Sequence, residues 1–192
     1  MNFIVLILPI ASALVIYWAR IREIRTIRDT VKGEVRENLT LRLFIAVGSL
    51  MLIGSIAEQL WFRPALSLPL FASGWAIALS SFWLRRRAIR ELGKMWSLHV
   101  EIREQHQLVM SGPYRWVRHP AYTSMVLELA SFGLLLQSRY TSALVAVLFI
   151  PTLILRIRIE EAALSEQVAG YSEYQRNTPA LLPYKLPGAV QS

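Results

Sequence analysis

The sequence predicts an all-α integral membrane protein with about five transmembrane helices, organised as a single polytopic domain over residues 1–192. Hydrophobic residues make up 54% of the chain, above the roughly 45–50% that is usual for soluble domains. They are grouped in apolar blocks of about 15 to 20 residues, close to the length needed to cross a bilayer as a helix. The mean hydropathy of +0.39 agrees with this class.

Each apolar block defines one expected span. The first block lacks a basic n-region and a small-residue cleavage site, so we expect it to be a retained helix and not a signal peptide. The last two blocks are short and are separated by residues 137–139 alone, which predicts a tight antiparallel hairpin or a re-entrant pair. The expected spans are roughly Phe3–Ala19, Leu43–Trp61, Ala65–Leu84, Tyr122–Leu136 and Tyr140–Leu155.

The distribution of Lys and Arg predicts the orientation, because cytosolic loops are enriched in these residues. Basic residues are numerous between the first two spans and in the segment 85–121, whereas the other two connections contain only Arg63 and Arg139. We therefore expect the N-terminus outside, and the segment 85–121 and the C-terminal tail in the cytosol. The net charge of +8 is explained by anionic lipid at the inner leaflet, so nucleic acid is not an expected partner.

Residues 112–122 (GPYRWVRHPAY) are the richest candidate for a binding site. Pro120 suits the first turn of a helix, and free backbone amides there, beside Arg118, are expected to form a site for an anionic cofactor group. An alternative interpretation is structural: Tyr114 and Tyr122 belong to an interfacial aromatic belt and Arg118 anchors the topology.

Arg156 and Glu160 form a second candidate, because residues four apart on a helix share a face. A guanidinium held by a carboxylate can grip a substrate carboxylate with two parallel hydrogen bonds. The alternative is an ordinary surface ion pair. Glu128 is expected in the middle of a span, so it should face other helices. The absence of Cys and of metal-ligand or phosphate-loop spacings argues against thiolate chemistry, metal sites and phosphoryl transfer.

The pattern Gly112-x-Tyr114-x-x-x-Arg118-His119-Pro120-x-Tyr122, followed by a hydrophobic hairpin and Glu160-Glu161, resembles the isoprenylcysteine carboxyl methyltransferase family. The resemblance covers about residues 93–184, which divides the chain into N-terminal helices (1–92) and a methyltransferase core (93–192). It implies S-adenosylmethionine as cofactor, S-adenosylhomocysteine as product, and a cytosolic cofactor pocket over the hairpin. Ser124 departs from the family, in which many members have glycine. The residues that the resemblance assigns to the cofactor are His106, Gln107, Leu108, Val109, Gly112, Tyr114, Arg118, His119, Pro120, Ala121, Tyr122 and Glu160.

Within this resemblance, Arg156 and Glu160 are the expected catalytic residues. The expected partners are membrane lipids and a lipophilic carboxylate substrate, such as an isoprenylated cysteine. No metal is expected. Other functions stay open. The acceptor could be an amine or thiol, with Glu160 or Glu161 as general base. Similar RHPxY endings also occur in membrane sterol reductases and phospholipid methyltransferases, so an NADPH-dependent lipid reductase is a second alternative, and a non-catalytic membrane subunit is a third.

Overall fold

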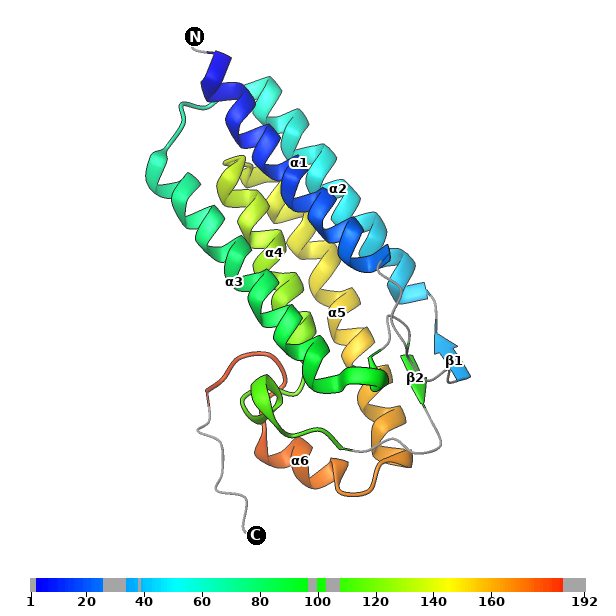
Figure 1. Cartoon of the computed structure of the whole chain (residues 1–192). Helices are drawn as coiled ribbons and strands as arrows, with labels where there is room; N and C mark the ends of the chain where they lie inside the picture. The colour runs from blue at the N-terminus through cyan, green and yellow to red at the C-terminus, as the bar shows by residue number, and fades with distance from the viewer. Residues whose placement is uncertain (1–2, 26–33, 38, 97–99, 103–107, 185–192) are drawn as a thin grey trace.

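In the computed structural model, five long helices form an elongated bundle (Figure 1). The structure describes residues 3–25, 34–37, 39–96, 100–102 and 108–184. A short helix α6 (Tyr171–Asn177), two 3-10 turns and a two-stranded ribbon lie at one end of the bundle. The long helices are α1 (Phe3–Arg25), α2 (Leu39–Phe62), α3 (Leu68–Leu92), α4 (Pro120–Leu135) and α5 (Arg139–Gln167).

Small residues allow the helices to approach closely, as is usual between membrane helices. A Cβ added to Gly74 of α3 would lie 2.7 Å from Leu135 of α4, and one added to Gly54 of α2 would lie 2.8 Å from Thr141 of α5. Between the same pairs, the Ser81 hydroxyl donates to a carbonyl of α4 at 2.7 Å, and the hydroxyls of Ser55 and Ser138 are 2.7 Å apart. Helices α3 and α4 therefore form one close pair, and α2 and α5 form another.

The five expected spans correspond to the five long helices, and three of these helices are long and apolar enough to cross a membrane: residues 5–23, α2 and α5. Helix α3 carries Arg85, Arg86 and Arg87 in its last turns, and α4 has only 16 residues. Helix α5 continues well past the expected end at Leu155 to Gln167. The expected tight connection between α4 and α5 is present, with Gln137 in a left-handed conformation at φ 50°.

A short antiparallel ribbon was not predicted from the sequence. Strand β1 (Glu34–Glu37) pairs with β2 (Val100–Ile102), with Glu34 opposite Ile102. The ribbon, α6, the C-terminal ends of α1, α3 and α5 and the N-terminal ends of α2 and α4 all lie at the same end of the bundle (Figure 1). The arginine-rich segments that were predicted to share one side of the membrane therefore meet at one end of the molecule.

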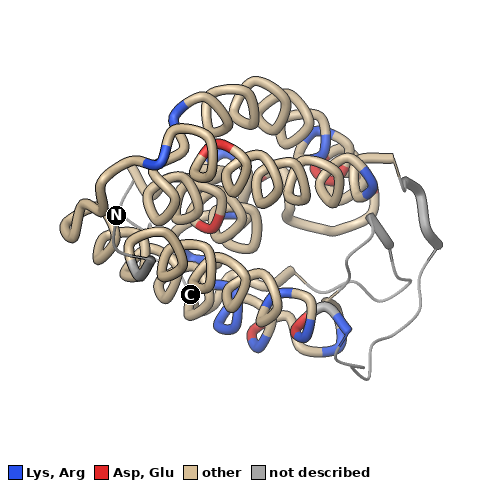
Figure 2. Tube along the Cα trace, turned by 90° about the horizontal axis from the view of Figure 1, so that it is seen from above, with Lys and Arg blue, Asp and Glu red and all other residues tan. Residues whose placement is uncertain are grey.

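Several charged residues of the bundle lie in pairs of opposite sign. Seen along the bundle, the acidic positions lie next to basic positions (Figure 2), in agreement with ion pairs between Arg20 and both Glu23 and Glu128, and between Arg118 and Glu161. Pairing reduces the cost of placing a charge away from water.

Candidate functional site

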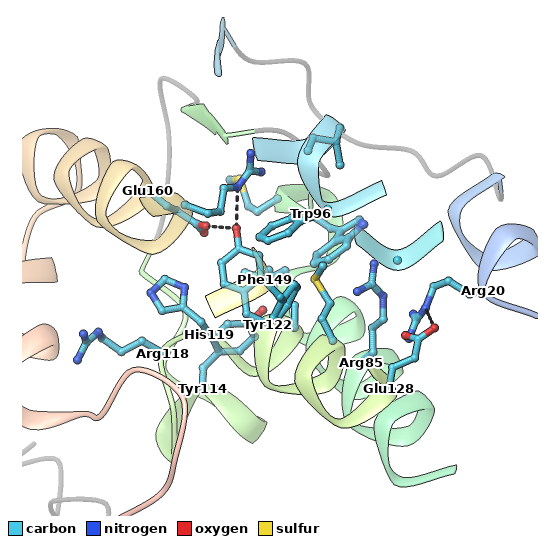
Figure 3. Close-up of a pocket in the computed structure, with 18 of the residues that line it drawn as sticks. Arg20, Arg85, Trp96, Tyr114, Arg118, His119, Tyr122, Glu128, Phe149 and Glu160 are labelled. Atoms are coloured by element: carbon cyan, nitrogen blue, oxygen red, sulfur yellow. Dashed lines mark hydrogen bonds and ion pairs between the residues drawn. The ribbon is translucent and has the colours of Figure 1, made fainter. Parts of the chain in front are cut away.

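A cavity of about 500 Å³ opens at the basic end of the bundle and is lined by residues of all five long helices and of α6. This volume is within the roughly 300–1,000 Å³ range of small-molecule sites. Figure 3 shows Tyr122 and Glu160 on one side, Arg20 and Glu128 on the other, and Phe149 between them. The cavity thus has polar groups on two sides and an apolar middle.

The hydroxyl of Tyr122 connects the two residues that were expected to be catalytic. It accepts a hydrogen bond from Arg156 Nε at 3.0 Å and donates one to Glu160 Oε2 at 2.5 Å (Figure 3). A second guanidinium nitrogen of Arg156 donates to Thr40 Oγ1 of α2 at 3.0 Å. The side chain of Arg156 is buried, with only 3% of its surface exposed, so its orientation is set by α2 and α4 as well as by its own helix.

Arg118 and His119 hold the C-terminal segment in place. Arg118 forms an ion pair with Glu161 at 2.7 Å and donates to the carbonyls of Gln175 and Thr178, and His119 Nε2 lies 2.9 Å from Glu161 Oε1. The backbone amides of both residues donate to the carbonyls of residues 179 and 180 at 2.9 and 3.0 Å. These two amides are therefore occupied by the C-terminal segment. In the first turn of α4, where free amides were expected, the amides of Tyr122 and Thr123 both donate to the His119 carbonyl.

Three tyrosines and a tryptophan form an aromatic wall of the cavity: Tyr114, Tyr171, Tyr174 and Trp96. The hydroxyl of Tyr174 donates to the Tyr114 carbonyl at 2.5 Å, while the buried hydroxyl of Tyr171 has no hydrogen-bond partner among the described residues. Burial raises the pKa of each of the three tyrosines, so their hydroxyls are neutral at physiological pH. A buried donor without a partner costs free energy unless a bound group pairs with it.

A buried group of four charges lies on the other side of the cavity. Arg20 of α1 donates to both carboxylate oxygens of Glu128 of α4, with the Nε–Oε1 bond at 2.9 Å, and also pairs with Glu23. Arg85 of α3 lies 3.5 Å from Glu23 and stacks at 5.5 Å over the ring of Trp96. The expectation that Glu128 faces other helices is confirmed, and its partner lies 108 positions away in the sequence.

The structure brings most of the expected site residues together. Gly112 and Pro120 are not among the residues that line the cavity: Gly112 begins a 3-10 turn at φ 56°, and Pro120 begins α4. His106 and Gln107 lie outside the described residues. The expected residues that line the cavity are Leu108, Val109, Tyr114, Arg118, His119, Ala121, Tyr122, Arg156 and Glu160.

Sequence reasoning did not identify several other residues of the site. Thr40 and Tyr171 lie outside the motif and gave no signal, and the role of Arg20 depends on a contact with Glu128 that local spacing cannot reveal. Within the described part of the chain, no group of three or more His, Asp or Glu residues could hold a metal ion.

Comparison with known proteins identifies the segment that builds much of this cavity. A model of the isoprenylcysteine carboxyl methyltransferase family matches residues 72–166, from α3 to the last turn of α5. The match begins and ends earlier than the resemblance expected over about residues 93–184: it includes most of α3 and stops before α6.

Several bacterial proteins are similar to this chain. The uncharacterized protein YpbQ of Bacillus subtilis is 35% identical over 91 residues, which are 47% of this chain and 54% of that protein. The cobalt-zinc-cadmium resistance protein CzcN of Cupriavidus metallidurans is 32% identical over 97 residues, 50% of this chain and 45% of that protein. The nickel-cobalt-cadmium resistance protein NccN of Alcaligenes xylosoxydans is 31% identical over 93 residues, 48% of this chain and 44% of that protein. The matched stretch thus spans about half the length of these relatives.

Proposed function

Since residues 72–166 match a model of the isoprenylcysteine carboxyl methyltransferase family, we propose that this membrane protein is an S-adenosylmethionine-dependent methyltransferase that esterifies the carboxylate of a lipophilic acceptor. The observation that carries the proposal is the buried connection from Thr40 through Arg156 and Tyr122 to Glu160, in a cavity that reaches from the polar end of the bundle into its apolar interior.

The role proposed for Arg156 is to bind and orient the acceptor. A planar guanidinium matches a carboxylate with two parallel hydrogen bonds, and the contacts to Thr40 and Tyr122 hold this guanidinium against the cavity. A carboxylate is already ionised at neutral pH, so its attack on a methyl group needs no general base. Positioning is therefore the main task of the site, and it can supply several kcal/mol of the barrier.

The residues of the aromatic wall fit the proposed cofactor. Bound S-adenosylmethionine would supply a methyl group on a sulfonium, which passes to the acceptor oxygen while the carbon–sulfur electron pair stays on sulfur. The unpartnered Tyr171 hydroxyl offers a hydrogen bond to a polar ligand, and the ring of Trp96 offers apolar contact. Further apolar contact comes from other lining residues: Leu108, Val109, Leu164 and Val168. Glu160, held by Tyr122, would lie between the cofactor side and the acceptor side of the cavity.

The position of the cavity also fits the two reactants. An apolar acceptor comes from the bilayer and a charged cofactor from water, so their meeting point should lie at an interface. We propose that the arginine-rich end of the bundle faces the cytosol, with the N-terminus outside, because basic loops are retained on that side.

Two assays on detergent-purified protein test this function. We expect S-adenosylhomocysteine to bind in isothermal titration calorimetry, and tritiated methyl groups to pass from S-adenosylmethionine to N-acetyl-S-farnesylcysteine as an alkali-labile ester. A methylated product that is stable to alkali would indicate an amine or thiol acceptor instead. Binding of NADPH without binding of S-adenosylhomocysteine would indicate a reductase and contradict the proposal.

A further inference from the structure

The cavity continues from Arg156 into the bundle as an apolar arm. The ring of Phe44 packs against the ring of Phe149 at 5.4 Å and against Tyr122 at 6.2 Å, which places aromatic groups directly behind the polar residues. The residues that line this arm come from α1, α2, α4 and α5: Tyr17, Phe44, Gly48, Met125, Leu129, Phe132 and Phe149.

The depth of the arm follows from the helices that enclose it. The hydrogen bond between Thr40 and Arg156 places the start of α2 beside the guanidinium. Gly48 lies eight positions further along α2, about 12 Å deeper at the rise of an α-helix. On α4, Phe132 lies ten positions beyond Tyr122, about 15 Å deeper. The arm is therefore deep enough for a hydrocarbon chain whose carboxylate is held by Arg156.

Gly48 is unusual among the glycines of the bundle. A Cβ at Gly54 or Gly74 would clash with a neighbouring helix, so glycine is needed there for close packing. A Cβ at Gly48 would meet no atom within 4 Å, and Gly48 lines the cavity. Glycine in the middle of a helix is less favourable than alanine, and close helix packing does not explain it at this position. What glycine provides here is open space in the apolar arm.

We propose that Gly48 determines the length of the hydrocarbon tail that the site accepts. This inference rests on the proposed methyltransferase function and assigns the tail-binding part of that site. Gly48, Phe44 and Tyr17 all lie outside the segment 72–166 that matches the family, so the N-terminal helices contribute part of the wall that contacts the tail, including the position proposed to set its length. Residues of the matched segment hold the carboxylate.

The test compares two acceptors that differ by one isoprene unit, N-acetyl-S-geranylcysteine and N-acetyl-S-farnesylcysteine, with protein in lipid nanodiscs. In Gly48→Leu the added side chain occupies the arm, and loss of contact with about two methylene groups predicts a loss of about tenfold in kcat/KM for the farnesyl acceptor relative to the geranyl acceptor. Gly48→Ala should shift the ratio in the same direction by a smaller factor. Ala46→Leu, at an exposed position of the same helix, is the matched control and should leave the ratio unchanged.

Calorimetric binding of both acceptors in the presence of S-adenosylhomocysteine is measured in parallel, so that the tail inference does not depend on turnover. Two results overturn the role of Gly48: an equal loss of kcat/KM for both acceptors in Gly48→Leu, or an unchanged ratio of the two kcat/KM values in a folded variant. If the wild-type protein binds both acceptors but methylates neither, the proposed chemistry fails and the binding ratio alone decides the tail inference. If it binds neither acceptor, both proposals fail.

Discussion

Replacement of Arg156 tests the acceptor-binding role, because the proposal assigns this guanidinium to the acceptor and the aromatic wall to the cofactor. In Arg156→Ala the hydroxyls of Thr40 and Tyr122 lose a charged donor at 3.0 Å, and the acceptor carboxylate loses its guanidinium. Removal of one partner of a buried charged pair costs about 2–5 kcal/mol, which corresponds to a loss of about 30-fold to several thousandfold in kcat/KM. Arg156→Lys keeps the charge but not the planar guanidinium that can form two parallel hydrogen bonds, so its loss of kcat/KM should be smaller.

The assay is tritiated methyl transfer to N-acetyl-S-farnesylcysteine, combined with calorimetric binding of S-adenosylhomocysteine and thermal unfolding of each variant. We expect the affinity for S-adenosylhomocysteine to change by less than about threefold, because the proposal assigns Arg156, which bonds to Thr40 of α2 and Tyr122 of α4, to the acceptor. Methyl transfer by folded Arg156→Ala within about threefold of the wild-type rate would refute the reasoning. A parallel loss of cofactor affinity would place Arg156 on the cofactor side instead.

Three further substitutions test other parts of the site. Glu128→Ala removes one of the two carboxylates that pair with Arg20 and should lower the free energy of unfolding by about 1.5–3 kcal/mol. In thermal unfolding, the double variant with Arg20→Ala should lose less stability than the sum of the two single variants. Additive losses would show that the two residues are not coupled. Arg118→Ala removes the side-chain bonds to the carbonyls of Gln175 and Thr178, so limited proteolysis should cut the C-terminal segment several times faster than in the wild type. An unchanged rate of cleavage would show that Arg118 does not hold this segment in place. Tyr171→Phe removes a buried hydroxyl that has no partner among the described residues. It should raise the melting temperature slightly and weaken S-adenosylhomocysteine binding by about five- to tenfold. An unchanged affinity would show that this hydroxyl does not contact the cofactor.

The sequence predicted the five long helices and the family because both depend on local information. Apolar blocks of a given length predict helices, and the motif from Gly112 to Tyr122 together with Glu160 and Glu161 indicated the family that matches residues 72–166. Helix ends were less predictable. Helix α5 continues to Gln167, and in this extension Glu160 bonds to Tyr122 and Glu161 bonds to Arg118 and His119, contacts that hydropathy does not report.

The candidate site could be predicted only in part. The spacing of Arg156 and Glu160 predicted a pair on one helix face, but in the structure both residues contact the hydroxyl of Tyr122, which belongs to another helix. Arg118, which was expected to bind the cofactor, lines the cavity, and its guanidinium binds Glu161 and the C-terminal segment.

Composition, hydrophobic spacing and the RHP motif by themselves determined the class of protein, the helices and the family that residues 72–166 match, because each is a property of neighbouring residues. Only the tertiary structure decided which charges meet: Arg20 with Glu128, and Arg156 with Thr40, are separated by 108 and 116 positions. It also decided that Gly48 leaves space where Gly54 and Gly74 do not. The physical reason is that a helix sets its own length and faces through local bonds, while the partner of each face depends on how distant helices pack.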